Sequence, residues 1–184
     1  MALIVTSHRT SREKLQRRYA DAYILDVTSA GPDPWVCFSP FYPHGGIPVP
    51  FSPGLVSASV EGIWQGLKVF ESMDVDPSRF TITNMTGIKR SVGEYGKVLG
   101  HRAGVEGEQL LSYVEARRVI YLPSYRWVLE HRLQELLAEL MRLKAEKTVV
   151  LLDYETNCNV KDVTRPLSHA GLIKLYLEGI WPTM

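Results

Sequence analysis

The sequence has few cysteines, no long apolar run and almost no net charge, and each absence excludes a class of protein. Its 184 residues include two cysteines, Cys37 and Cys158, which lack the spacing of a metal site. We therefore expect reduced thiols rather than a disulfide. No apolar run approaches the roughly 20 residues that span a membrane, and the first one is too short for a secretion signal. These absences predict a soluble cytoplasmic protein.

The charged residues nearly cancel, and several familiar catalytic motifs are missing. Lysine and arginine total 21 and aspartate and glutamate total 20, for a net charge of +1. A chain without a strong basic field is not expected to bind nucleic acid avidly and non-specifically. It has no Walker loop and no GxGxxG, HExxH or GxSxG motif, which disfavours classical nucleotide hydrolysis and triad chemistry. We expect neither a metal nor a cofactor.

Short apolar and β-branched runs near both ends of the chain predict strands, with helices between them. The strands are expected at about 3–6, 23–28, 35–38 and 148–152, and the helices at about 10–19, 57–72, 89–99, 108–120, 124–144 and 168–177. This order predicts a mixed α+β fold, rich in helix with a small sheet, in one compact domain over residues 1–184.

The predicted helix at 57–72 has sides of different chemistry. Apolar residues, Trp64 among them, recur at three- and four-residue spacing, which is the pattern of a helix packed on a core. Gly62 and Gly66 share another side, where the missing side chains let a neighbouring backbone approach closely.

The remaining side of this helix carries Glu61, Gln65 and Lys68 at positions i, i+4 and i+7. A carboxylate and an ammonium group placed this close exchange protons with a substrate or hold its polar edge, while an amide both donates and accepts. We therefore predict Glu61 and Lys68 as catalytic residues and Gln65 as a substrate-binding one. The alternative is a solvated helix face, where such pairs are common.

An aromatic loop containing prolines, residues 38–46, precedes this helix. Proline fixes its shape, so its rings are held in place. Phe41 and Tyr42 are predicted to wall a pocket for a flat base or a sugar face, together with Trp64 from the helix. The alternative is a hydrophobic cluster beneath the loop.

Cations stand beside glycines in two places, at 87–90 and at 100–104. Arginine offers a fork of donors to a phosphate, and the amides that open a following helix add partial positive charge. The second cluster is preferred because its histidine and arginine lie between two glycines. His101 and Arg102 are therefore predicted to grip a phosphate, unless they are solvated charges in a turn.

A polar cluster follows the predicted strand at 148–152. Asp153, Glu155 and Asn157 come directly after it, and α/β domains usually present ligands at the ends of their strands. Asp153 is predicted as a second catalytic carboxylate opposite Glu61, with Glu155 and Asn157 contacting the substrate. The alternative is that Asp and Asn simply form the turn.

The aromatic loop and the helix after it together resemble the NADAR family of N-glycosidases. Residues 39–43 match the family's aromatic loop, and residues 59–68 match its S-V-E-x-x-x-Q-x-x-K helix in type, spacing and order. Gly100-His101-Arg102 is similar to a displaced form of the family's Gly-Arg segment. The family's D-x-x-W-G ending is absent, and a strand, a helix and a strand precede the motif.

The resemblance implies hydrolysis of an N-glycosidic bond in a ribosylated nucleotide-type substrate. Members of this family act on early intermediates of the riboflavin pathway or on ADP-ribose attached to guanine. The implied ligand here is a nucleotide or a ribosylated base, either free or attached to nucleic acid. A transition state like an oxocarbenium ion needs a nearby carboxylate and a proton donor or acceptor, which agrees with the residue types at Glu61 and Lys68.

Two other functions fit the same residues. One is a module that binds a nucleotide or an ADP-ribosyl group without cleaving it. The other is a domain whose aromatic loop docks a protein partner. Ligand-induced thermal stabilisation separates a binder from a docking protein, and product analysis separates an enzyme from a binder.

Overall fold

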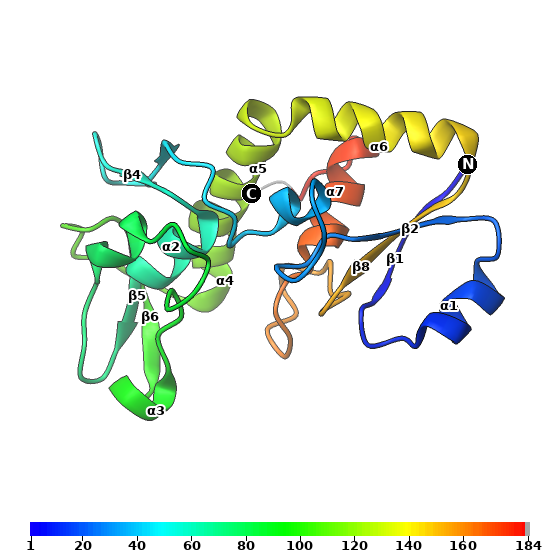
Figure 1. Cartoon of the computed structure of the whole chain (residues 1–184). Helices are drawn as coiled ribbons and strands as arrows, with labels where there is room; N and C mark the ends of the chain where they lie inside the picture. Colours follow the sequence, from blue (N-terminus) through cyan, green and yellow to red (C-terminus); the bar gives the residue numbers. More distant parts are fainter. Residues whose placement is uncertain (183–184) are drawn as a thin grey trace. The chain divides into compact units, whose positions relative to one another are not determined.

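The residues pack in two groups in the computed structural model, which describes residues 1–182 (Figure 1). Met1–Ser39 and Leu133–Pro182 form one unit, called here the terminal unit, and Pro40–Arg132 form the other, the middle unit. Both units contain helices and strands, so the fold is mixed α+β, as predicted. Two such units are compatible with one domain or with two, so the single domain over residues 1–184 stays a prediction.

The terminal unit is built on a three-stranded parallel sheet. Its order is β1 (Leu3–Ser7), β8 (Val149–Asp153), β2 (Tyr23–Asp26), so the last strand in the chain lies between the first two (Figure 1). Every residue of β8 is buried, which explains its almost continuous apolar run, because a central parallel strand is covered on both faces. These three strands were predicted from the sequence.

Helices α1 (Arg12–Arg18), α6 (Gln134–Glu146) and α7 (His169–Leu177) complete this unit. Ser11 and Ser168 begin α1 and α7 by accepting amide hydrogen bonds, as N-cap residues do. The final helix was predicted from the same residues. None of the helices in residues 1–182 has the length and the apolar character needed to traverse a bilayer.

Two predictions for segments that lie partly or wholly in the terminal unit were wrong. The segment Trp35–Phe38 is a 3-10 helix, η1, rather than a strand, since its amides donate to carbonyls a few residues back instead of to a neighbouring strand. The long helix expected at 124–144 is two helices, α5 (Leu122–His131) and α6. The leucine period runs through the break because Leu133, although outside both helices, is buried like its neighbours in the pattern.

The middle unit holds two small antiparallel sheets. One joins β5 (Lys68–Phe70), β6 (Val98–Arg102) and β7 (Leu110–Leu111) in that order, and the other pairs β3 (Ile47–Pro48) with β4 (Val56–Ser57). Figure 1 shows β5 and β6 side by side below α2. These short strands could not be predicted from the sequence, because two to five residues are too few to establish a period.

The helices of the middle unit are shorter than predicted. The one expected at 57–72 is α2 (Val60–Gly66), and β5 follows it directly. Val69 and Phe70 are both buried, so β5 is covered on both faces, and Phe70 alone continues the apolar stripe of the predicted helix. The helix expected at 89–99 is reduced to α3 (Val92–Tyr95), followed by β6.

The helix expected at 108–120 also differs from the prediction. It contains β7, then the short α4 (Tyr113–Ala116), which a capping box at Ser112 begins, and a π-helical turn η3 (Arg117–Tyr121) that leads into α5. The remaining element is the 3-10 helix η2 (Pro77–Thr81).

The glycine side of α2 is packed as predicted. A Cβ added to Gly62 would lie 2.7 Å from the carbonyl oxygen of Arg79, and one added to Gly66 would lie 2.3 Å from the ring of Phe80. Both neighbours belong to η2, which therefore approaches α2 more closely than any larger residue would allow.

We expect Gly66→Ala to lower the free energy of unfolding by about 1–3 kcal/mol, because the new methyl group overlaps the buried Phe80 ring. Urea denaturation measures this change. Gly93→Ala in α3 is the matched control, since nothing lies within 4 Å of its Cβ position. Equal stability of the two variants would contradict the close approach.

Candidate functional site

The first turn of α2, the predicted catalytic helix, is bonded to the aromatic loop before it. Ser59 accepts a hydrogen bond from the amide of Gly62 at 3.0 Å and so begins the helix. The amide of Glu61 donates to the carbonyl of Pro40 at 2.8 Å, which fastens the loop to the first turn. The Glu61 side chain is only 8 % exposed. A buried carboxyl group next to a fixed loop is an unusual arrangement, because burying a charge is costly.

Glu61, Gln65 and Lys68 form one hydrogen-bonded chain, although Lys68 lies in β5 rather than in the helix. Nε2 of Gln65 donates to Oε1 of Glu61 at 2.8 Å, and Nζ of Lys68 donates to Oε1 of Gln65 at 3.2 Å. Within residues 1–182, Oε2 of Glu61 accepts no hydrogen bond. The amide therefore separates the carboxyl from the ammonium group and leaves one carboxyl oxygen available.

Burial moves the pKa values of the two ends of this chain toward each other. It raises the pKa of Glu61 above the ordinary 4.5, against the opposing effects of the Gln65 hydrogen bond and the charges of Lys68 and Lys89. Burial lowers the pKa of Lys68 below the ordinary 10.5, against the attraction of Glu61. A carboxyl group that is easier to protonate and an ammonium group that is easier to deprotonate are suited to exchanging protons with a substrate.

Arg90 holds the turn between α2 and β5 in place. Its guanidinium donates to the carbonyls of Gln65 at 3.1 Å, Lys68 at 2.7 Å and Asp74 at 2.7 Å, and its amide donates to Oε1 of Gln65 at 3.1 Å. Only 5 % of the residue is exposed, and its Nε has no hydrogen-bond partner within residues 1–182. Arg90 thus fixes the orientation of the Gln65 amide.

Trp64 packs in an aromatic cluster with His101, Tyr113 and Tyr121. The His101 ring centroid lies 3.8 Å from that of Trp64, and each tyrosine ring meets Trp64 edge-on at 5.6 Å. Trp64 is 8 % exposed. These contacts account for Trp64 as a packed residue of the middle unit, and its predicted contact with a substrate stays a prediction.

His101, in β6, is completely buried, and its ring is neutral. Neither ring nitrogen makes a hydrogen bond of good geometry within residues 1–182. Burial first, and the Lys68 ammonium second, lower the pKa of His101 to about 3, while the Trp64 backbone opposes this only weakly. A neutral ring offers no positive charge to a phosphate.

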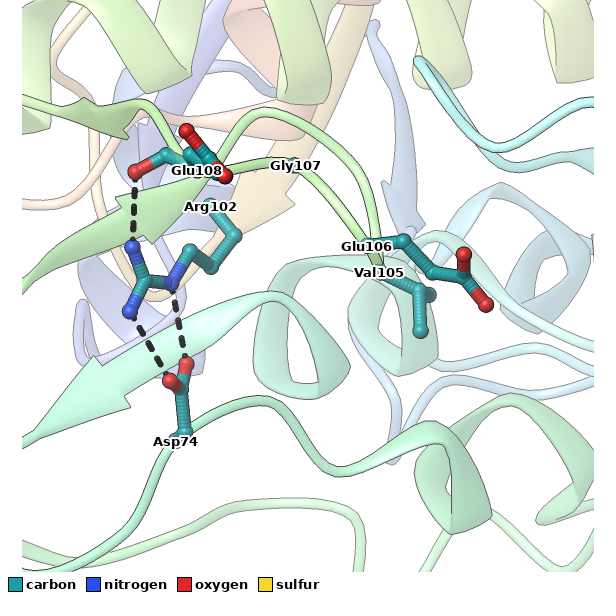
Figure 2. A pocket seen from close by; sticks show the side chains of 6 residues that line it. All are labelled: Asp74, Arg102, Val105, Glu106, Gly107 and Glu108. Carbon is teal, nitrogen blue, oxygen red and sulfur yellow. Dashed lines mark hydrogen bonds and ion pairs between the residues drawn. The ribbon is translucent and has the colours of Figure 1, made fainter.

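Arg102 is engaged by neighbours in the middle unit, as Figure 2 shows. Its Nε and Nη2 donate to the two carboxylate oxygens of Asp74 at 3.1 and 2.9 Å, and its Nη1 donates to the carbonyl of Glu108 at 2.8 Å. The adjacent pocket of about 240 Å³ is also lined by the carboxylates of Glu106 and Glu108. Acidic side chains and an occupied guanidinium fork disfavour a phosphate here. The segment is a strand rather than the predicted loop between helices.

Lys89, from the cation cluster at 87–90 that was not preferred in the sequence analysis, lies beside the predicted site. Its Nζ stands 5.3 Å from the centroid of the Phe41 ring, and its charge lowers the pKa of Glu61. Phe41 and Tyr42 are half-buried, and the Tyr42 ring contacts that of His44 at 4.8 Å. The structure therefore brings the aromatic loop, Lys89 and Glu61 together within the middle unit.

Asp153 is occupied by contacts within the terminal unit. Its Oδ2 accepts hydrogen bonds from the Ser168 hydroxyl at 2.8 Å and the Ala170 amide at 3.1 Å, and it lies 3.1 Å from Nδ1 of His169. Its Oδ1 accepts from the Tyr154 amide at 2.7 Å. These bonds tie the end of β8 to the beginning of α7. Glu61 belongs to the other unit, so the predicted pairing of the two carboxylates stays a prediction.

Asn157 stabilises the loop that follows β8. Its Nδ2 donates to the carbonyls of Asp162 and Arg165, each at 3.1 Å, and its Oδ1 accepts from the Asn159 amide at 2.9 Å. All of its amide atoms are thus used within the loop. Glu155 is half-buried beside it, and its predicted contact with a substrate stays a prediction.

Comparison with known proteins identifies a family whose function is unknown. The model of a family of unknown function, DUF6939, matches residues 7–173. The chain belongs to this family. No curated protein and no solved structure matches the chain. The DUF6939 match covers most of both units, including the whole of α1, α2 and β8. What the DUF6939 family does must therefore be argued from the side chains.

Proposed function

We propose that this protein hydrolyses an N-glycosidic bond in a ribosylated nucleotide-type substrate, with Glu61 as its main catalytic residue. One observation carries the proposal: the buried chain of Glu61, Gln65 and Lys68, in which burial shifts the pKa values of the acid and the amine toward each other. A solvated helix face would show neither the burial nor pKa shifts caused by loss of water, because exposed charges keep their hydration.

In the proposed reaction, Glu61 accepts one proton and Lys68 donates another. Ionised Glu61 accepts a proton from the attacking water through its available Oε2 and stabilises positive charge at C1 of the ribose. The bond from C1 to the base nitrogen breaks, and the departing nitrogen takes a proton from Lys68. Gln65, hydrogen-bonded to both side chains, holds them in position. Afterwards the proton moves from Glu61 to Lys68, which restores the starting state.

The charges near Glu61 favour a substrate that carries phosphate. One carboxylate, Glu61, faces the cations of Lys68, Lys89 and Arg90, so the cluster has a net charge of +2 when all are ionised. Arg90 is committed to backbone carbonyls, whereas Lys89 is exposed. We assign Lys89 to a substrate phosphate and Phe41, beneath its ammonium group, to the flat base.

Product analysis tests the proposal. The full chain is incubated with ADP-ribosylated guanosine and, separately, with ribosylated pyrimidines of the riboflavin pathway, and free base and free sugar are followed by mass spectrometry. We expect stoichiometric release of base and sugar from one of these classes. Thermal stabilisation without any product would replace the enzyme by a binding module, and neither effect would reject both.

We expect Phe41→Ala to weaken binding of an accepted substrate by about 5- to 150-fold, since a ring stacked on a base contributes roughly 1–3 kcal/mol. Calorimetric titration measures the affinity, and urea denaturation measures the stability. Tyr42→Phe is the control for the loop, because it keeps the second ring and removes only the hydroxyl. A loss of several kcal/mol in stability with binding intact would show that Phe41 is a core residue.

A further inference from the structure

A second pocket lies in the terminal unit, beside α1. It has a volume of about 390 Å³, which lies within the range of small-molecule sites. Its walls come from α1, the end of β1 and the loop between them. The lining residues are Thr6, Thr10, Lys14, Leu15, Arg17, Arg18 and Tyr19.

The pocket lining carries three cations and no carboxylate. Lys14, Arg17 and Arg18 stand at i, i+3 and i+4 on α1 and therefore share one face of the helix. Within residues 1–182, none of the three makes an ion pair with an acidic side chain. Arg9 and Arg12, just before them in the chain, are likewise without an acidic partner in the described part. This excess of positive charge is local, since the whole chain carries only +1.

The longest helix of the same unit shows the opposite arrangement. In α6, Arg142 forms ion pairs with Glu139 and with Glu146, at i−3 and i+4. Like charges at these spacings destabilise a helix, and opposite charges stabilise it. The face of α1 thus places three like charges side by side, with Glu13 as the one carboxylate of the helix, and a bound anion would relieve their repulsion.

The floor of the pocket is apolar and fixed. Leu15 is 5 % exposed and packs against Val150 and Leu152 of β8, and Tyr19 packs against the same cluster. The guanidinium of Arg18 lies 5.4 Å from the centroid of the Tyr19 ring. The ligand of such a site combines an apolar or flat part with a strongly negative one, because the floor supplies contact area and the rim supplies donors.

We propose that this pocket binds a small molecule of the nucleoside polyphosphate class. The phosphates lie on Lys14, Arg17 and Arg18, with the hydroxyls of Thr6 and Thr10 as further donors, and the base lies over the apolar floor. The pocket belongs to the terminal unit and Glu61 to the middle unit, and the proposal does not depend on the proposed hydrolysis.

Calorimetric titration of the full chain with ATP tests this site. ATP is expected to bind, inorganic pyrophosphate to bind more weakly, and adenosine not to bind. Lys14→Gln and Arg17→Gln, made singly, are each expected to weaken ATP binding about tenfold or more, since each removes a charge-assisted hydrogen bond to phosphate. Unchanged melting temperatures of the two variants confirm that they are folded.

Three controls make the result specific. Lys144→Gln removes the same charge from α6, and Arg9→Gln removes it from outside the pocket, so both should leave ATP affinity within twofold. Lys89→Gln should also leave it unchanged, which excludes binding at the Glu61 cluster. Equal losses in these controls, equal binding of adenosine, or binding of a single-stranded oligonucleotide without binding of ATP would overturn the proposal.

Discussion

Glu61→Gln is expected to lower turnover of an accepted ribosylated substrate by about 100-fold or more while the protein remains folded. The substitution keeps the shape of the side chain and an oxygen that accepts the hydrogen bond from the Gln65 amide. It removes the carboxylate, which in the proposed reaction takes the proton from water. A buried neutral amide also costs less than a buried carboxylate, so stability should not fall. Unchanged hydrolysis by this variant would reject Glu61 as the catalytic residue.

The dependence of turnover on pH distinguishes a catalytic role for Glu61 from a structural one. If ionised Glu61 is the base, the rate should fall on the acid side through a pKa above 4.5, because burial raises the pKa of this carboxyl. If protonated Lys68 is the acid, the rate should fall on the alkaline side through a pKa below 10.5. Glu61→Gln should abolish the acid limb of its residual activity and leave the alkaline limb in place.

The free energy of unfolding is expected to fall as the pH is lowered below 6.5, through His101. The unfolded chain protonates this ring at its ordinary pKa of 6.5, whereas the folded protein does so only near pH 3. Between these values the unfolded state binds more protons, so lowering the pH favours unfolding, and the contribution is complete above pH 6.5. The loss through His101 should reach about 2 kcal/mol between roughly pH 6.5 and pH 4.5.

His101→Phe isolates this contribution, because phenylalanine keeps a ring against Trp64 and cannot titrate. Urea denaturation at a series of pH values should give a flatter dependence for this variant than for the natural chain. His131→Phe is the matched control, since His131 is also stacked on a tryptophan of the middle unit but is exposed. If both variants lose stability with pH as steeply as the natural chain, His101 is accessible to protons in the folded state.

The terminal unit was largely predictable because its signals are local and long enough. The apolar run from Val149 to Leu152 indicates a central strand, and Ser168 marks the beginning of the last helix. The middle unit was not predictable to the same extent. Phe70 continues the helical spacing of α2 while lying in a strand, and only the partner β6 decides between the two structures.

The candidate site divides in the same way. The spacing predicted that Glu61, Gln65 and Lys68 share one side of a helix, and the three side chains do meet in one hydrogen-bonded chain. The i+4 spacing explains the contact of Glu61 with Gln65, whereas Lys68 reaches Gln65 from β5. Arg90 was passed over, since it reaches Gln65 across 25 positions of sequence and no local pattern reports such a contact. Arg102 was favoured because glycines flank it, but its acidic partner Asp74 lies 28 positions earlier.

The place of β8 between β1 and β2 sets an order of events during synthesis. Leu3 in β1 and Tyr23 in β2 both pair with Val149, so neither strand has its ladder until the chain has grown past β8. The whole middle unit, Pro40–Arg132, is complete before that point. On the ribosome the middle unit can therefore fold first, and its folding shortens the long loop that β1 and β8 must close. Until then the first two strands emerge with unpaired edges, which makes the nascent chain most exposed to aggregation or chaperone binding in this interval.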